Sequence, residues 1–238
     1  MSSKITDRLA PRTVARITGG LYITYILAMI LADVLGHIGR GTVEQLYQAI
    51  ITNPASFRAG LVVNLFAALL FLATAWGLYV LLRSVDKNLA LLFLLLNAVG
   101  VGIHCLSSLP LISALLQGDA ASGTAAFSAA QLEGLARLSI NTYKTVFVSA
   151  QLFFSAWLFP LGYLVYKSKF LPRFLGVLLM LDGIGCLIWF LQGMLAPGLR
   201  AITYPGLLVS FVAEVGLALW LLVKGVKVSS ARTEVGVA

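Results

Sequence analysis

The chain has 238 residues, of which 60% are hydrophobic and only 11% are charged. A soluble domain carries about 25% charged residues, so this composition excludes an ordinary soluble enzyme, and a membrane bundle would leave no room for a separate catalytic domain. The net charge of +8 does not indicate nucleic-acid binding, because the Lys and Arg residues lie mostly in short segments between apolar runs.

Six apolar segments are each long enough to cross a membrane, which takes a helix of about 20 residues. They cover residues 14–37, 59–82, 89–117, 142–166, 173–195 and 205–224. The first is expected to be an uncleaved helix, because its apolar run is too long for a signal peptide and no small-residue cleavage site follows. The sequence therefore predicts an all-α, polytopic membrane helix bundle: six transmembrane helices in a single transmembrane domain, residues 1–238.

Two connecting segments carry the spacing of a capping box, Thr42 with Gln45 and Ser128 with Gln131. In a capping box the hydroxyl accepts a bond from the third residue of the helix, whose side chain reaches back to the cap. We predict short amphipathic helices over residues 43–52 and 129–140. They would cover the helix ends or, alternatively, form a lid over a cavity that opens outward.

Positive charge predicts the orientation, because Lys and Arg concentrate in the cytoplasmic loops of membrane proteins. One side of the predicted bundle holds twelve of the seventeen basic residues: Lys4, Arg8, Arg12, Arg16, Arg83, Lys87, Lys167, Lys169, Arg173, Lys224, Lys227 and Arg232. Both termini are therefore expected in the cytoplasm. Eight aromatic residues partly follow the placement of an interfacial belt. These are Trp76, Trp157, Trp189, Trp220, Tyr22, Tyr25, Tyr163 and Tyr166.

Four polar residues inside the apolar segments are candidates for a ligand-binding site: Asn64, His104, Asp182 and Glu214. An ionisable side chain in hydrocarbon costs about 2.5–3.5 kcal/mol on insertion scales, so each one needs a partner or a wet cavity. With a helical rise of about 1.5 Å per residue, Asp182 and Glu214 come to similar depth on consecutive helices. His104 and Asn64 come to a second shared depth.

These four residues allow two interpretations. Two close carboxylates cannot both stay ionised in a low dielectric, so one holds a proton, which is the physical basis of a proton-coupled site. In the structural alternative, each carboxyl is protonated or hydrogen-bonded to Gln151, Gln192 or a backbone carbonyl. His104 would then be satisfied by a neighbouring side chain. No spacing predicts a metal or another cofactor, because Cys105 and Cys186 both lie in apolar segments without metal-ligand spacing.

Three strings carry a resemblance to one family: RSVDKNLALL (residues 83–92), AFSAAQLEGLA (126–136) and PLGYLVYKSKFLPRFLGVLLMLDGIG (160–185). On these strings the chain resembles the bacterial DUF4386 family of small multi-helix integral membrane proteins, from Ala15 to about Leu195. The resemblance implies a multi-pass protein of the bacterial inner (cell) membrane, in contact with membrane lipids. It implies no activity, substrate or catalytic residue, so the candidate site depends on the physical reasoning above.

Our leading hypothesis is a protein that binds or transports a small-molecule or lipid-like ligand in a pocket between its helices. One alternative is an intramembrane lipid-modifying enzyme that uses the carboxylates or His104 as acid and base. Another is a helper or sensor subunit of a different membrane protein. The sequence leaves a homo-oligomer or a partner membrane protein open, and it predicts no nucleic-acid partner.

Overall fold

The computed structural model describes residues 10–119 and 126–226, and all regular structure in these residues is helical. Six helical segments are long and apolar enough to cross a membrane. They are α2 (Pro11–Gly36), α4 (Pro54–Leu82), α5 (Lys87–Asp119), α6 (Ala129–Lys167), α7 (Arg173–Leu195) and Arg200–Lys224. The last begins as the 3₁₀ turn η1 (Arg200–Thr203), continues as α8 (Tyr204–Leu219) and ends as the π-helical turn η2 (Trp220–Lys224). The predicted all-α membrane fold is confirmed, and the chain is a multi-pass membrane protein.

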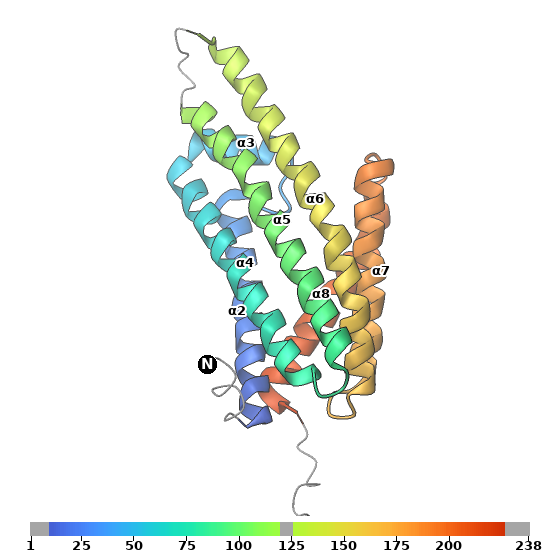
Figure 1. Ribbon diagram of the computed structural model, residues 1–238. Helices are drawn as coiled ribbons and strands as arrows, with labels where there is room; N and C mark the ends of the chain where they lie inside the picture. Colours follow the sequence, from blue (N-terminus) through green and yellow to red (C-terminus); the bar gives the residue numbers. More distant parts are fainter. Residues whose placement is uncertain (1–9, 120–125, 227–238) are drawn as a thin grey trace, which may run out of the picture.

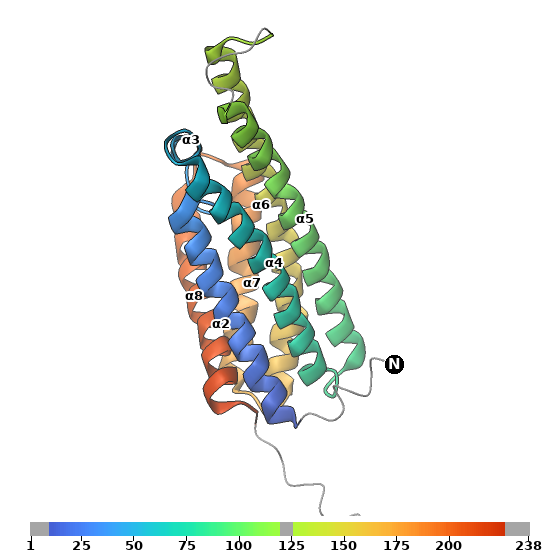
Figure 2. The ribbon, with the colours of Figure 1, turned by 90° about the vertical axis from the view of Figure 1, so that its left-hand side faces the viewer.

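The helices alternate in direction, so short turns join α4 to α5 and α6 to α7 at one end of the bundle (Figures 1 and 2). We call this the basic end. Helix α2 begins here and η2 ends here, with Gly225 packed against Arg12. The basic residues of this end that the structure describes are Arg12, Arg16, Arg83, Lys87, Lys167, Lys169, Arg173 and Lys224. An even number of crossings thus places the first and last described turns side by side.

Helices α5 and α6 extend past the other helices at the opposite end, which we call the far end (Figure 1). They have 33 and 39 residues. At a rise of about 1.5 Å per residue, each is far longer than a hydrocarbon core of about 30 Å. The predicted separate helix over 129–140 is wrong, because these residues form the first turns of α6. The buried stripe Leu132, Ala136, Ile140, Tyr143 and Phe147 keeps helical spacing across the expected boundary, so nothing breaks the helix there.

The short helix α3 (Val43–Thr52) lies at the far end and contacts α2, α4, α5 and α6. Its predicted capping box is confirmed: Gln45 N donates to Thr42 Oγ1 at 3.2 Å, and Thr42 N donates to Gln45 Oε1 at 2.8 Å. Arg137 of α6 donates to Glu44 Oε2 at 2.6 Å, and this hydrogen bond lowers the pKa of the Glu44 carboxyl. Helix α3 therefore packs against four of the membrane-spanning helices at the far end, an arrangement compatible with both predicted roles.

Large aromatic side chains fill the interior of the bundle. For two of them the predicted position in an interfacial belt is wrong. Trp157 is 1% exposed and Tyr22 is 0% exposed, so neither lies at a membrane surface. Trp157 instead meets the ring of Phe71 edge-on at 5.3 Å between centroids. Trp76 is 50% exposed, as a belt residue should be. The apolar windows of these helices are nearly uniform, so hydropathy alone does not separate an inward ring from an interfacial one.

Close glycine contacts hold α8 in place at both ends. Near its start, a methyl group on Gly185 of α7 would lie 2.8 Å from the Cα of Gly206. Near its end, a methyl group on Gly19 of α2 would lie 2.8 Å from the carbonyl oxygen of Ala218. Small residues of this kind let the backbones of membrane helices approach closely. Helix α8 therefore crosses the bundle on a slant, against α7 first and α2 afterwards (Figure 1).

Candidate functional site

A cavity of about 340 Å³ lies between the helices and runs from the middle of the bundle toward the α2–α3 connection. All six membrane-spanning segments contribute side chains to it. Along α8 the lining extends from Gly206 to Val215, about 14 Å at the helical rise. Of the four predicted site residues, His104 and Glu214 line the cavity, while Asn64 and Asp182 lie directly behind it.

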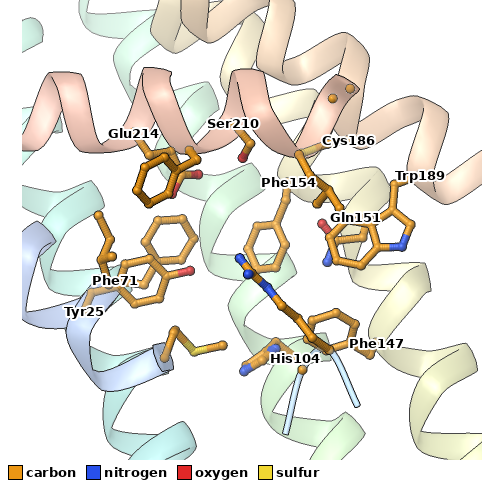
Figure 3. A pocket seen from close by; sticks show the side chains of 18 of the residues that line it. Tyr25, Phe71, His104, Phe147, Gln151, Phe154, Cys186, Trp189, Ser210 and Glu214 are labelled. Atoms are coloured by element: carbon orange, nitrogen blue, oxygen red, sulfur yellow. The ribbon is translucent and has the colours of Figure 1, made fainter. Parts of the chain in front are cut away.

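Aromatic rings form the wall of the cavity near its mid-membrane end (Figure 3). The rings of Tyr25 and Phe71 stack with their centroids 4.4 Å apart. Phe154 and Trp157 of α6 meet Phe71 edge-on, at 5.6 and 5.3 Å. Their spacing of three residues along α6 places both rings on one helix face. Stacked and edge-on rings fix one another, so this part of the wall is preformed.

The two carboxylates come together from α7 and α8, as their predicted depths required. Glu214 points into the cavity beside Tyr25 and Phe71 (Figure 3). Asp182 is 0% exposed, and its Oδ1 accepts a weak bond from Cys186 Sγ at 3.5 Å. Within the described residues, neither Asp182 Oδ2 nor the Tyr22 hydroxyl makes a hydrogen bond of good geometry, although Ser210 lies close to Asp182 and Glu214 lies close to Tyr22. The site thus contains acidic and hydroxyl groups that are close together but incompletely hydrogen-bonded.

His104 and Asn64 form the second predicted pair, and their shared depth is confirmed. His104 Nε2 lies 3.2 Å from Asn64 Oδ1, while Asn64 Nδ2 donates to Ser108 Oγ at 3.3 Å. Because the amide nitrogen is used by Ser108, the pairing requires His104 to donate through its Nε2–H. Its ring also contacts Phe147 edge-on at 5.4 Å. The neighbouring side chain that the structural alternative required for His104 is therefore Asn64.

The far end of the cavity carries charges of both signs, Asp33 and Arg40. Arg40 stands on the α2–α3 connection, which turns through Gly39 at φ 104°. Tyr143 and Lys144 hold this connection: the Gly39 N–H donates to the Tyr143 hydroxyl at 2.8 Å, and Lys144 Nζ donates to the Gly41 carbonyl at 2.5 Å. The connection that carries Arg40, at the charged far end of the cavity, is therefore held to α6 by two hydrogen bonds.

The cavity also reaches the lipid-facing surface between α2 and α8. Ile30 and Phe211 both line it, yet they are 51% and 57% exposed. The two helices touch tightly at the basic end, where Gly19 meets Ala218, so the opening lies in their far-end halves.

A comparison with protein families gives one match, to the family described as "Domain of unknown function (DUF4386)", over residues 17–225. The chain belongs to the DUF4386 family. A protein of Archaeoglobus fulgidus, named only "Uncharacterized protein", is 29% identical to this DUF4386 chain over 161 residues, 68% of this chain and 80% of that protein. No solved structure matches. The matched residues include every residue that lines the cavity.

The sequence missed several lining residues of this DUF4386 protein. The partial belt pattern of the sequence favours an interfacial position for Tyr25 and Trp157, whereas both line the cavity. The three-residue spacings of Tyr22 with Tyr25 and of Phe154 with Trp157 place their rings on shared helix faces. No pattern in the sequence indicates that Ser210 of α8 lines a cavity. Within the described residues Gln192 donates to the Ala196 carbonyl at 3.0 Å and makes no hydrogen bond to either carboxyl. No group of three or more His, Cys, Asp and Glu side chains suited to a metal occurs in residues 10–119 and 126–226.

Proposed function

We propose that this protein binds a small or lipid-like molecule in the cavity between its helices, to carry it across the membrane or to hold it there. The observation that supports this function is the cavity of about 340 Å³, whose aromatic wall ends in the convergent polar groups Glu214 and His104. Ligand pockets in proteins combine an apolar, aromatic lining with a few oriented polar groups in this way. The lateral opening beside Ile30 and Phe211 supplies a route for an amphipathic ligand.

The bond between His104 and Asn64 favours binding over the enzymatic alternative. A general acid or base must reach the proton of its substrate. His104 Nε2 is already engaged by Asn64 Oδ1 at 3.2 Å. The carboxyl of Glu214 lies beside the rings of Tyr25 and Phe71 (Figure 3). Groups arranged in this way suit recognition of a ligand.

Filling the cavity from α8 is expected to abolish ligand binding. Ser210 faces the cavity, whereas Leu208 on the same helix is 66% exposed and faces lipid. We expect Ser210→Trp to lose binding of the uncharged fluorophore N-phenyl-1-naphthylamine, while Leu208→Trp binds like the wild type. Binding is measured as the fluorophore's emission with protein in lipid nanodiscs, relative to empty nanodiscs. Equal emission from Ser210→Trp and the wild type would count against the cavity as the binding site.

We further propose that the protein lies in the inner membrane of a bacterium, with the basic end in the cytoplasm. Single cysteines in a background where Cys105 and Cys186 are replaced by alanine test the orientation. A membrane-impermeant maleimide added to intact cells is expected to label Gly134→Cys, an exposed far-end position, and to leave Lys87→Cys unlabelled. Permeabilised cells should show labelling of both. The reverse pattern in intact cells would invert the topology.

A further inference from the structure

We propose that the ligand of this cavity is an organic cation, whose positively charged nitrogen lies beside Glu214 among the rings of Tyr25 and Phe71 and exchanges there with a proton. This inference rests on the proposed function and assigns the ligand's chemical class. The exchange balances in charge: the cation enters, the carboxyl O–H bond breaks, and the proton leaves to solvent. No oxidant, reductant or covalent bond to the ligand is involved.

The distribution of charge around the cavity leaves one end without a cation. Asp33 and Arg40 both line the far end, which therefore carries one charge of each sign. At the mid-membrane end, Glu214 lines the cavity and Asp182 lies behind it. No ion pair to either carboxyl is formed within residues 10–119 and 126–226. A carboxylate in a low dielectric needs a proton or a cation, so an external cation can replace the proton.

The groups that face Glu214 are acidic or neutral on every helix packed against α8. Helix α2 contributes Tyr22 and Tyr25, and α7 contributes Asp182 and Cys186. His104 of α5 also lines the cavity but is bonded to Asn64. Asp182 and Tyr22 are fully buried, and neither Asp182 Oδ2 nor the Tyr22 hydroxyl makes a hydrogen bond of good geometry among the described residues. The groups close to them are Ser210, beside Asp182, and Glu214, beside Tyr22, and neither is a cation.

The aromatic wall favours an organic cation over a metal ion. The face of an aromatic ring carries a partial negative charge and attracts an ammonium group. Phe71 is surrounded by the rings of Tyr25, Phe154 and Trp157, at 4.4, 5.6 and 5.3 Å. A transition metal such as zinc would require three or four His, Cys or carboxylate ligands, which the described residues do not group together. An anion beside Glu214 would be repelled.

Three probes of similar size and different charge test the inference: benzyltrimethylammonium, its uncharged carbon isostere neopentylbenzene, and the anion phenylacetate. Binding to the full-length protein in phosphatidylglycerol nanodiscs is followed through the fluorescence of Trp157 and Trp189, which line the cavity. We expect the cation to bind about tenfold or more tightly than its isostere. Its affinity should rise about tenfold per pH unit while the carboxyl exchanges its proton, with one proton released per cation in weak buffer.

Matched variants assign the effect to Glu214. Glu214→Gln should weaken benzyltrimethylammonium binding about tenfold or more and remove the pH dependence. Neopentylbenzene binding should be unchanged, which shows that the variant is folded, and Glu214→Asp should restore the pH dependence. Glu133→Gln makes the same change at an exposed carboxyl outside the cavity and should behave like the wild type. Adding phosphatidylethanolamine to the nanodiscs shows where the natural cation comes from. If this lipid competes with benzyltrimethylammonium for binding, the ligand is the amine of a lipid headgroup; if binding of the probe is unchanged, the ligand is a free amine.

Equal binding of the cation and its isostere would overturn the inference, as would tighter binding of phenylacetate or a cation affinity that does not change with pH. If the wild type still binds the uncharged fluorophore and Ser210→Trp does not, the proposed function survives that outcome. If neither the fluorophore nor any of the three probes binds the wild type, the proposed function fails together with the inference.

Discussion

Replacing Gly19 by alanine is expected to destabilise the bundle by about 1–3 kcal/mol, the usual cost of overpacking a tight contact. The added methyl group would lie 2.8 Å from the carbonyl oxygen of Ala218 and against the backbone nitrogen of Leu222. Both are backbone atoms, so they cannot rotate away as a side chain would. The contact yields only if α8 moves relative to α2, and α8 carries Glu214. The same variant should therefore weaken fluorophore binding as well as stability.

Gly20→Ala is the matched control for this variant. A methyl group on Gly20 would meet only the Leu222 side chain, at 3.9 Å. Glycine inside a helix is about 0.5–1 kcal/mol less favourable than alanine, so Gly20→Ala should leave stability unchanged or raise it slightly. Both free energies of unfolding are measured by titrating dodecyl sulfate into mixed micelles and following circular dichroism. Similar losses in the two variants would show that the close contact between α2 and α8 is absent.

Removing either member of the His104–Asn64 pair is expected to cost about 1–3 kcal/mol, because the remaining buried polar group loses its partner. Asn64 is 0% exposed and His104 is 6% exposed, so water does not compensate readily. The single variants are Asn64→Leu and His104→Leu. Replacing both side chains leaves no unpaired polar group of this pair. The double variant should therefore be less destabilised than the sum of the single variants, by about 0.5–3 kcal/mol.

The same dodecyl sulfate titration measures this double-mutant cycle. Gln151→Leu in the wild type and in His104→Leu serves as a comparison, because Gln151 lines the cavity but makes no hydrogen bond to the pair within the described residues. Its coupling to His104 should be near zero. Additive effects of Asn64→Leu and His104→Leu would mean that the two side chains do not bond to each other in the membrane.

The crossings and the depths of the polar residues could be predicted because membrane helices are regular. The rise per residue alone places Asn64 and His104 at one level, and they are in contact at 3.2 Å. Asp182 and Glu214 likewise lie on consecutive helices within electrostatic range of each other. The capping boxes at Thr42 and Ser128 are local, so the sequence predicts both helix starts.

The cavity itself could not be predicted, because it depends on which helix faces meet. The slant of α8 is set by the contacts of Gly206 with Gly185 and of Gly19 with Ala218. Hydropathy describes how apolar a segment is and carries no information on such pairings. For the same reason Trp157 was predicted at a membrane surface, although its neighbours Phe71 and Phe93 bury it. The depth of a residue in the membrane follows from its position along its own helix. The residue that faces it on another helix depends on how the whole bundle packs.

An experimental structure of the protein purified in lipid nanodiscs, with no ligand added, tests the central claim most directly. We expect six crossings, with Asp182 and Glu214 facing inward. We also expect non-protein density in the cavity between Glu214 and the rings of Tyr25 and Phe71. A tightly packed, dry centre in place of the cavity would contradict the claim, as would carboxylates turned outward to the acyl chains.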